Sequence, residues 1–265
     1  MVTEERLDEL LTRLRLTAIR DQLDSLLDEA ARAQMTLREA LLFLAEREVT
    51  RRDARRIQMG MKLARFPYVR TLEGFDFEAQ PSVDPGQIRD LASGRWVGHA
   101  QALLLLGPPG VGKTHLAVAL GREAVERGYS VLFLTAAALM GQLMKAYTDG
   151  HLEEKLMQLS KPKLLIIDEL GYLPLEPAAA HLFFQLVARR YERSSILITS
   201  NRPVGEWGQV FGDAVAATAI LDRLLHHSQV ITIREFARLA AAMDAHGPLC
   251  VGIDPHAALL RSWGL

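Results

Sequence analysis

Eight residues, GPPGVGKT at positions 107–114, combine a flexible backbone with a cation and a hydroxyl group. They fit the pattern G-x-x-x-x-G-K-[ST] in full, in which glycines let main-chain N–H groups approach an anion with no Cβ in the way. Lys113 can reach the β- and γ-phosphates as a point charge, and Thr114 can offer its hydroxyl to Mg²⁺. The predicted nucleotide-binding residues are Gly107, Pro108, Pro109, Gly110, Val111, Gly112, Lys113, Thr114 and His115.

A second chemical feature is the pair of carboxylates that follows an apolar run in LLIIDE, positions 164–169. At the end of a strand the chain turns, so both acids can border the phosphate site. Asp168 is placed to hold Mg²⁺ directly or through water, and Glu169 is then a candidate base that orients the attacking water. An Asp-Glu pair after a strand is also a common helix start. Beside a complete phosphate-binding loop, we favour the catalytic interpretation.

Two further residues extend the predicted site. Asn201 follows the run ILITS and is expected beside Asp168, where its amide can hydrogen-bond the attacking water or the γ-phosphate, although Asn is also common in turns. Arg223 lies among apolar residues in the helical stretch AILDRLLHH. It either pairs with Asp222 or a neighbouring helix, or it is an arginine finger supplied to the site of an adjacent subunit.

The elements that position these residues follow from the apolar pattern of residues 101–233. Short apolar runs alternate with stretches long enough for crossover helices, which is typical of a parallel sheet covered on both faces. The phosphate-binding loop directly follows the first run, in the strand–turn–helix context that its pattern requires. We therefore expect an α/β domain with five strands, at 102–106, 131–134, 164–167, 196–199 and 230–233.

Residues 1–66 are expected to form an all-helical domain. Thr36 and Glu39 form a capping box that starts a long helix. The spacing i, i+3, i+4, i+7 of an amphipathic helix is shown by Leu7, Leu10, Leu11 and Leu14. Positions 47–70 carry eight bases and two acids. Two interpretations are open: a solvated helix face that screens the acids upstream, or a stripe of charge that follows the phosphates of double-stranded DNA. The candidate DNA-binding residues form two pairs, each one helical turn apart: Arg51 with Arg55, and Arg52 with Arg56.

Residues 67–100 are predicted to be a connector, because FPYVRTLEGFDFEAQPSVDPG contains three Pro and two Gly. Phe75 and Phe77 lie two positions apart in this segment. Their side chains could pack against the next domain or cover a bound nucleotide base, and we favour packing. The net charge of −1 predicts no polyanion partner from the whole-molecule field, so any DNA contact must come from local clustering of charge. A single Cys and the absence of a long apolar run favour a reducing, cytoplasmic location with no membrane partner.

The segments GPPGVGKTHLAVALGREA, LLIIDELGYLPL, ITSNRPVGEWGQVFGD and AILDRLLHH together resemble the IstB family, and the likeness covers most of residues 1–233. Members of this family are AAA+ ATPases that help the transposases of insertion sequences, and they are similar to the DnaC helicase loaders. The resemblance implies an AAA+ P-loop NTPase fold over residues 101–233, with ATP and Mg²⁺ as cofactors.

The resemblance also implies roles for single residues: Lys113 binds phosphate, Thr114 and Asp168 bind Mg²⁺, and Asp168 with Glu169 serves hydrolysis. Asn201 is then the first sensor and Arg223 the finger that acts in a second copy of a homo-oligomer. ATP-dependent assembly on DNA, contact with the transposase of the same element, and selection or preparation of target DNA are implied as well. Two alternatives stay open: a helicase loader with the same chemistry, and a nucleotide-gated DNA scaffold without useful turnover.

Residues 234–265 depart from the family, whose members continue with a short Gly-x-Ser-Tyr-Arg segment. This tail instead resembles the start of orotidine 5′-phosphate decarboxylase, with GPLCVGIDPH as the first barrel strand and Asp254 as its substrate-side acid. Because a (β/α)₈ barrel needs roughly 250 residues, we predict no decarboxylase activity. Our hypothesis is that the reading frame has run into a host gene; the alternative is a terminal helix whose similarity is accidental. No second-sensor arginine can be assigned, and Arg234 is a poor substitute.

Overall fold

The protein is represented by a computed structural model that describes residues 2–172 and 175–234. The chain divides into two compact units, with the boundary between Met59 and Gly60. The predicted strand GPLCVGIDPH and Asp254 lie outside the described residues. Within the described ranges, none of the helices has the length and the apolar character that crossing a membrane requires.

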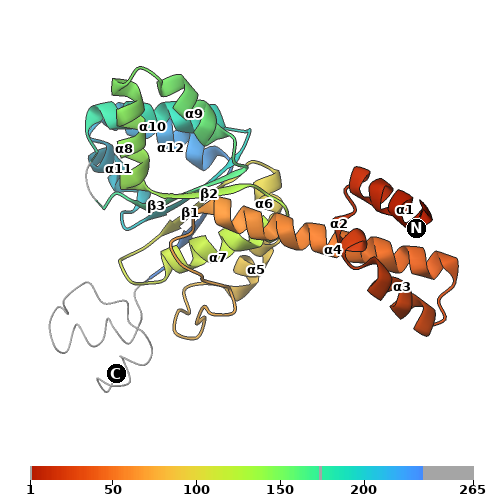
Figure 1. Cartoon of the computed structure of the whole chain (residues 1–265). Coiled ribbons are helices and arrows are strands. Elements are labelled where there is room, and N and C mark those ends of the chain that lie inside the picture. Colours follow the sequence, from red (N-terminus) through yellow and green to blue (C-terminus); the bar gives the residue numbers. More distant parts are fainter. Residues whose placement is uncertain (1, 173–174, 235–265) are drawn as a thin grey trace. The chain divides into compact units, whose positions relative to one another are not determined.

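The first unit is entirely helical, as predicted (Figure 1). The capping box is confirmed: Thr36 N donates to Glu39 Oε2 at 2.8 Å, and Glu39 N donates to Thr36 Oγ1 at 3.4 Å. The long helix that follows it continues past the boundary into the second unit. The helices are α1 (Val2–Arg13), α2 (Thr17–Asp21), α3 (Leu23–Arg32) and α4 (Leu37–Ala64).

Glu48 of α4 organises the interior of this unit. Its carboxylate is buried, and Oε2 accepts hydrogen bonds from Ala18 N at 2.7 Å and Ile19 N at 3.2 Å. These are the unpaired N–H groups of the first turn of α2, whose N-cap residue, Leu16, provides no side-chain acceptor. Glu48 therefore caps a helix that lies 29 to 30 residues away in the sequence.

The predicted apolar stripe of α1 is only partly buried. Leu11 is 7% exposed, whereas Leu7 and Leu10 are 40% and 42% exposed, and Leu14, which follows the last residue of α1, is 63% exposed. The difference from the expected pattern has a physical reason: a unit of about 60 residues has too much surface for its volume to cover every apolar side chain. The periodicity thus identified the helix correctly, but not which of its leucines are buried.

In the described part of the second unit, five strands form one sheet whose neighbouring strands all pair in parallel, which confirms the predicted fold class. The strand order is β2-β3-β4-β1-β5, so the strand before the phosphate-binding loop lies between β4 and β5. The strands are β1 (Ala102–Leu106), β2 (Val131–Thr135), β3 (Leu164–Leu170), β4 (Ser195–Ser200) and β5 (Ser228–Thr232).

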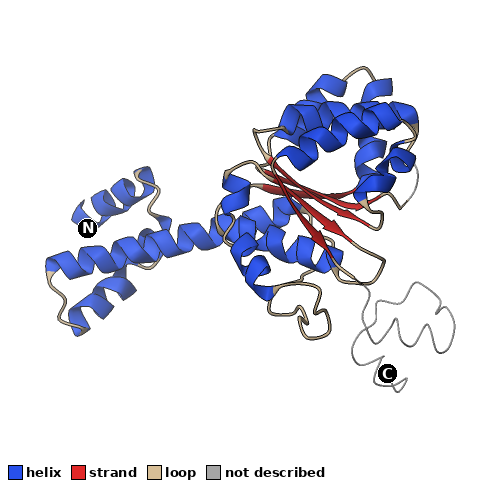
Figure 2. Ribbon diagram, turned by 180° about the vertical axis from the view of Figure 1, so that it is seen from behind, coloured by secondary structure: helices blue, strands red, loops and turns tan. Residues whose placement is uncertain are grey.

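Two helical layers cover the two faces of this sheet (Figure 2). Successive strand residues alternate between the layers: Leu104 packs in the core with α8 to α12, and Leu103 packs in the core with α5 to α7. The helices of the first core are α8 (Ala136–Thr148), α9 (Leu152–Ser160), α10 (Pro177–Arg190), α11 (Trp207–Phe211) and α12 (Ala214–His226). Those of the second core are α5 (Pro85–Ala92), α6 (Arg95–Gly98) and α7 (Lys113–Glu126); a 3₁₀ turn, η1 (Val204–Glu206), precedes α11.

The structure adds detail at the edges of the predicted elements. Strand β5 begins and ends earlier than the predicted range of 230–233, and β3 continues through both acids of the LLIIDE run. Residues 67–100 contain α5 and α6, and Ile88 and Trp96 of these helices are buried in the second core. Asp84 caps α5 by accepting from Gly86 N and Gln87 N. This segment is therefore part of the packed second unit.

Candidate nucleotide-binding site

The loop between β1 and α7 has the backbone shape that its sequence predicts. A Cβ atom on Gly107 would lie 2.1 Å from the carbonyl oxygen of Ile233, so only glycine fits there. Gly112, with φ of +91°, is the N-cap of α7, which begins at Lys113. The loop thus leads into a helix N-terminus, where unpaired N–H groups and the helix dipole favour an anion. The ammonium of Lys113 folds back over the loop and donates to Pro108 O at 2.6 Å.

The structure brings Thr114 and Asp168 together from positions 54 residues apart. Thr114 Oγ1 lies 3.0 Å from Oδ1 and 3.1 Å from Oδ2 of Asp168. Thr199 of β4 donates from Oγ1 to Asp168 Oδ1 at 2.5 Å, and the same Oγ1 accepts from Glu169 N at 2.9 Å. A hydroxyl and a carboxylate are the oxygen donors that a small divalent cation prefers.

Burial controls the charges of this site. Burial lowers the pKa of Lys113, although Asp168 and Glu169 act in the opposite direction. Burial also raises the pKa of Asp168, against the hydrogen bonds from Thr199 and Thr114 and the charge of Lys113. Each group is thus shifted toward its neutral form, because a charge removed from water needs a partner of opposite sign. A bound polyanion and a bound cation are the partners that would restore both charges.

Consecutive carboxylates of β3 occupy different environments. Asp168 is 4% exposed, whereas Glu169 lies on the surface. The pairing of β3 with β4 shifts register between Ile167 and Leu170, and Glu169 has a φ of +63°. Such a conformation is uncommon for a residue other than glycine and is concentrated at functional sites. The break in register allows an exposed Glu to follow a buried Asp directly.

Asn201 follows β4, the strand next to β3, as predicted. Its Oδ1 atom is buried and has no hydrogen-bond partner among the residues that the structure describes. An unpaired buried acceptor costs about 1–3 kcal/mol, so a donor from outside the described residues is favoured there. Within the described residues, the Asn201 Oδ1 atom does not bond to Asp168, and β4 contributes the Thr199 hydroxyl to the site instead.

Thr199 belongs to the site but lies outside the sequence motifs that predicted it. It interrupts the apolar run of SILITS one position before the end of β4. A hydroxyl in a strand that is buried along its whole length needs a hydrogen-bond partner. A threonine within an apolar run is therefore the sequence signal that could have indicated Thr199.

The segment before α5 packs against the phosphate-binding loop. The Phe75 ring is 9% exposed and makes edge-to-face contacts with Phe77 at 4.8 Å and with His115 at 5.3 Å between ring centres. His115 Nε2 lies 2.8 Å from Thr71 O. A Cβ atom on Gly112 would lie 2.7 Å from Phe75 Cε2. Phe75 therefore packs in the core directly against the loop, which is the interpretation favoured from the sequence.

Replacing Gly112 with alanine is expected to weaken ATP binding about tenfold or more. The left-handed backbone costs about 1–2 kcal/mol for a residue with a Cβ, and every 1.4 kcal/mol is a factor of ten. The close contact with Phe75 adds to this cost. Titration with a fluorescent ATP analogue measures the effect. The matched control is Gly141→Ala, because a Cβ there meets no atom within 4 Å. Equal affinity of the two variants would contradict the assigned loop geometry.

Arg223 lies at the other end of the sheet from the phosphate-binding loop. Helix α12 ends at His226 and leads into β5, whose first residue, Ser228, pairs with Ala102 at the start of β1. The loop instead follows Leu106, at the opposite end of β1. Arg223 and the phosphate-binding loop therefore lie near opposite ends of the strands β1 and β5.

The side chain of Arg223 is held by its own helix and by α10. Its Nη1 donates to Ala219 O at 3.0 Å, and its guanidinium carbon lies 4.8 Å from the centre of the Phe184 ring. This is the contact with a neighbouring helix that was one of the two sequence-based interpretations. A stacked guanidinium is worth about 0.5–1 kcal/mol at an exposed site, which leaves it free to exchange this partner for a stronger one.

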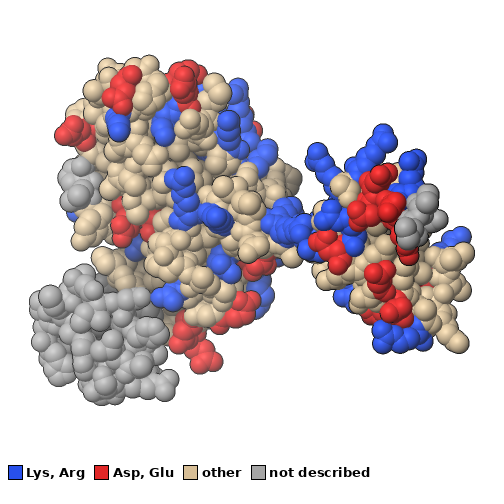
Figure 3. Space-filling model, in the orientation of Figure 1, with Lys and Arg blue, Asp and Glu red and all other residues tan. Residues whose placement is uncertain are grey.

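The four candidate DNA-binding arginines of α4 all have partners inside the first unit. Charges of both signs are interspersed over this unit (Figure 3). Exposed ion pairs of this kind are worth about 0–1 kcal/mol each. The partners are Asp21 for Arg51 at 3.1 Å, Glu48 for Arg52 at 2.9 Å, the Thr17 hydroxyl for Arg55 at 2.9 Å and Asp53 for Arg56 at 3.4 Å.

Fold and site together define a P-loop nucleotide-binding protein of the AAA+ type: a parallel sheet of order β2-β3-β4-β1-β5, a phosphate-binding loop after β1 and an acid pair at the end of β3. The sequence profile of the family described as IstB-like ATP binding protein matches residues 9–242. The chain therefore belongs to this family of ATP-binding proteins.

Named relatives agree with this assignment. The chain is 46% identical over 231 residues to an ATP-binding protein of insertion sequence IS5376 from Geobacillus stearothermophilus, covering 87% of this chain and 92% of that protein. It is 47% identical over 228 residues to an ATP-binding protein of insertion sequence IS21 from Pseudomonas aeruginosa, covering 86% of each. Among solved structures, DnaI matches with a TM-score of 0.53 and 25% identity, over 65% of this chain and 93% of that chain.

Proposed function

We propose that this protein hydrolyses ATP as a DNA-bound helper of the transposase of an insertion sequence. The observation that carries the chemical part of this proposal is the contact between Thr114 Oγ1 and the Asp168 carboxylate at 3.0 and 3.1 Å. Glycine at positions 107 and 112 lets the loop pack closely against Ile233 and Phe75, and a loop of this kind presents main-chain N–H groups to phosphate oxygens. The names of the relatives connect such a site with insertion sequences, and therefore with a transposase as the client.

The residues of the site fit Mg²⁺ and a triphosphate. Thr114 and Asp168 would hold the cation, which when bound neutralises charge on the β- and γ-phosphates. The loop amides and Lys113 hold the phosphate chain. Glu169 accepts a proton from the attacking water as its oxygen bonds to the γ-phosphorus; the bond from that phosphorus to the β–γ bridging oxygen breaks, and ADP leaves. Asn201 offers its unpaired Oδ1 as a second acceptor for that water.

The position of Arg223 supports a reaction that needs more than one copy of the chain. It lies in the last turn of α12, which leads into the start of β5, whereas the chain's own phosphate loop follows the end of β1. From that end of the sheet, the guanidinium would act on a γ-phosphate bound to another subunit. We therefore propose a homo-oligomer in which Arg223 completes the site of its neighbour, so that turnover per chain rises with protein concentration.

The basic face of α4 is proposed to contact the phosphates of double-stranded DNA. The arginines there are held by weak exposed pairs that phosphate oxygens can replace. Arg55 and Arg56 are the best positions to test, because Arg52 also supports the buried Glu48. Contacts of this kind bind DNA with little sequence preference and weaken steeply with salt.

The double substitution Arg55→Ala/Arg56→Ala is expected to reduce affinity for duplex DNA and to lower the slope of log affinity against log salt by about 2, one for each lost phosphate contact. Fluorescence anisotropy over a series of salt concentrations measures both quantities. Arg38→Ala, an exposed arginine of the same helix outside the stripe, is the control and should leave the slope unchanged. An unchanged slope in the double variant would show that these arginines do not contact DNA phosphates and serve only in ion pairs within the chain.

The proposed function as a whole is tested by phosphate release with and without duplex DNA over a range of protein concentrations. Release that requires Mg²⁺ and rises with DNA and with concentration supports an oligomeric DNA-dependent ATPase. Nucleotide-dependent DNA binding with no release under any condition would instead identify a scaffold. Capture of a replicative helicase rather than the transposase of the same element would favour a helicase loader; the insertion-sequence relatives favour the transposase.

A further inference from the structure

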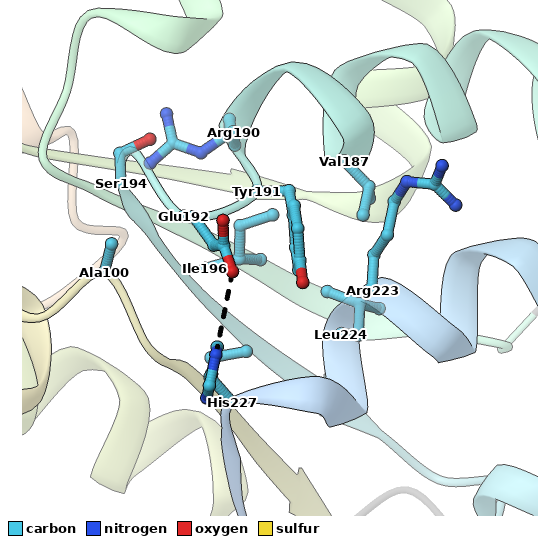
Figure 4. Close-up of a pocket in the computed structure, with 11 residues that line it drawn as sticks. Ala100, Val187, Arg190, Tyr191, Glu192, Ser194, Ile196, Arg223, Leu224 and His227 are labelled. Atoms are coloured by element: carbon cyan, nitrogen blue, oxygen red, sulfur yellow. Dashed lines mark ion pairs between the residues drawn. The ribbon is translucent and has the colours of Figure 1, made fainter.

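A cluster of four side chains lies where α10 and α12 end, away from the phosphate-binding loop. Tyr191 and Glu192 follow the last residue of α10, and His226 and His227 end α12. Figure 4 shows Glu192 and His227 pointing toward one another with Tyr191 beside them, and the Arg223 guanidinium directed away from the pair. Nothing in the proposed ATP chemistry uses these four side chains.

Three donor atoms of this cluster converge. Glu192 Oε1 lies 3.7 Å from His227 Nε2 and 4.0 Å from His226 Nδ1, and the three atoms all lie within 4.8 Å of one another. Zinc bonds of about 2.0–2.2 Å separate neighbouring tetrahedral ligands by about 3.3 Å. The side chains are 55–57% exposed, so small rotations can close the difference.

The local backbone explains why adjacent histidines can act together. Neighbouring residues within a helix point in different directions. His227 has left the helix, with φ −131° and ψ 73°, and its ring centre lies 4.1 Å from that of His226. Glu192 has a φ of +55°, which is uncommon for a residue other than glycine. The C-terminal end of α12 also favours a positive charge through the helix dipole.

We propose that Glu192, His226 and His227 form a binding site for a divalent transition metal of the zinc class. Two imidazoles and one carboxylate make a donor set typical of Zn²⁺ sites that keep a position open for water. The Tyr191 hydroxyl, now 2.5 Å from His226 Nδ1, is left next to the carboxylate when the metal takes that nitrogen. It then orients Glu192 as an outer hydrogen-bond donor.

Such a metal would join the end of α10 to the end of α12. Arg223 lies on α12 one turn before His226 and packs on Phe184 of α10, so the metal would brace the two helices that hold the proposed finger. The site needs neither ATP nor a second copy of the chain. Its existence is therefore tested separately from the proposed function.

Isothermal titration of the full chain with Zn²⁺, in excess Mg²⁺ and without nucleotide, is the primary experiment. One saturable site per chain is expected, with affinity reduced at least about 10-fold in His227→Ala and in Glu192→Gln. The control is His181→Ala, an exposed histidine of α10 outside the cluster, which should retain the wild-type affinity. Cys250→Ser should also retain the wild-type affinity, which would exclude the Cys250 thiolate as a Zn²⁺ ligand.

Co²⁺ substitution gives a second readout that does not depend on stability. A visible absorption band typical of a Co²⁺ site with nitrogen and oxygen ligands is expected for the wild type and should be lost in His227→Ala. His181, Glu192 and His227 are exposed, so their variants are expected to fold, and circular dichroism checks this for every variant. The absence of saturable Zn²⁺ binding, or equal binding by His227→Ala and His181→Ala, would overturn the proposal and leave the cluster as a hydrogen-bonded contact between two helices.

Discussion

Replacing Arg223 with alanine is expected to reduce ATP hydrolysis by ~10³–10⁵-fold, while nucleotide affinity changes little. The reason is geometric: Arg223 lies at the end of the sheet opposite its own phosphate-binding loop, so the finger that we propose would act in a neighbour's site. Such an interaction is made chiefly in the transition state and therefore affects the rate more than binding. Steady-state phosphate release, together with titration of a fluorescent ATP analogue, measures both quantities.

Mixed assemblies make this prediction specific. Arg223→Ala chains retain their own loop and acid pair, and Glu169→Gln chains retain Arg223, so a mixture of these two inactive variants should recover part of the wild-type activity. Arg189→Ala is the matched control, because Arg189 is a half-buried arginine of α10 that pairs with Glu153 at 2.7 Å, outside the proposed site. Loss of nucleotide binding in Arg223→Ala, or a mixture of the two variants that stays inactive, would count against a finger in trans.

Replacing Glu169 with glutamine is expected to leave ATP and Mg²⁺ binding intact and to slow phosphate release by ~10²–10⁴-fold. Glutamine has the same shape but cannot accept a proton from water. Since Glu169 is exposed and Asp168 is buried against Thr114 and Thr199, the substitution leaves the proposed cation ligands in place. Single-turnover hydrolysis with preloaded ATP separates the chemical step from binding.

The control for Glu169→Gln is Glu154→Gln, which removes an exposed carboxylate from the first turn of α9 and should hydrolyse ATP at the wild-type rate. Asp168→Asn should behave differently from Glu169→Gln, because it removes the proposed Mg²⁺ ligand and weakens metal-dependent binding. If Glu169→Gln released phosphate at the wild-type rate, Glu169 would not be the base, and water activation would have to come from another group.

Local features of the sequence were sufficient to predict the fold class and the phosphate-binding loop. The alternation of apolar runs with helical stretches predicted all five strands, because the strands of a parallel sheet covered by helices are mostly apolar. The sequence pattern of the loop predicted its backbone shape, because that shape depends on glycines within a few residues of one another. The same is true of the Thr36–Glu39 cap, whose partners are three positions apart.

Only the tertiary structure decided which distant residues meet. The contact of Thr199 with Asp168 and the packing of Phe75 against Gly112 depend on strand order and on the path of the segment before α5. The capping of α2 by Glu48 joins residues about thirty positions apart. One-dimensional patterns report periods and neighbours along the chain, whereas these contacts arise from burying polar groups that must find partners wherever folding places them.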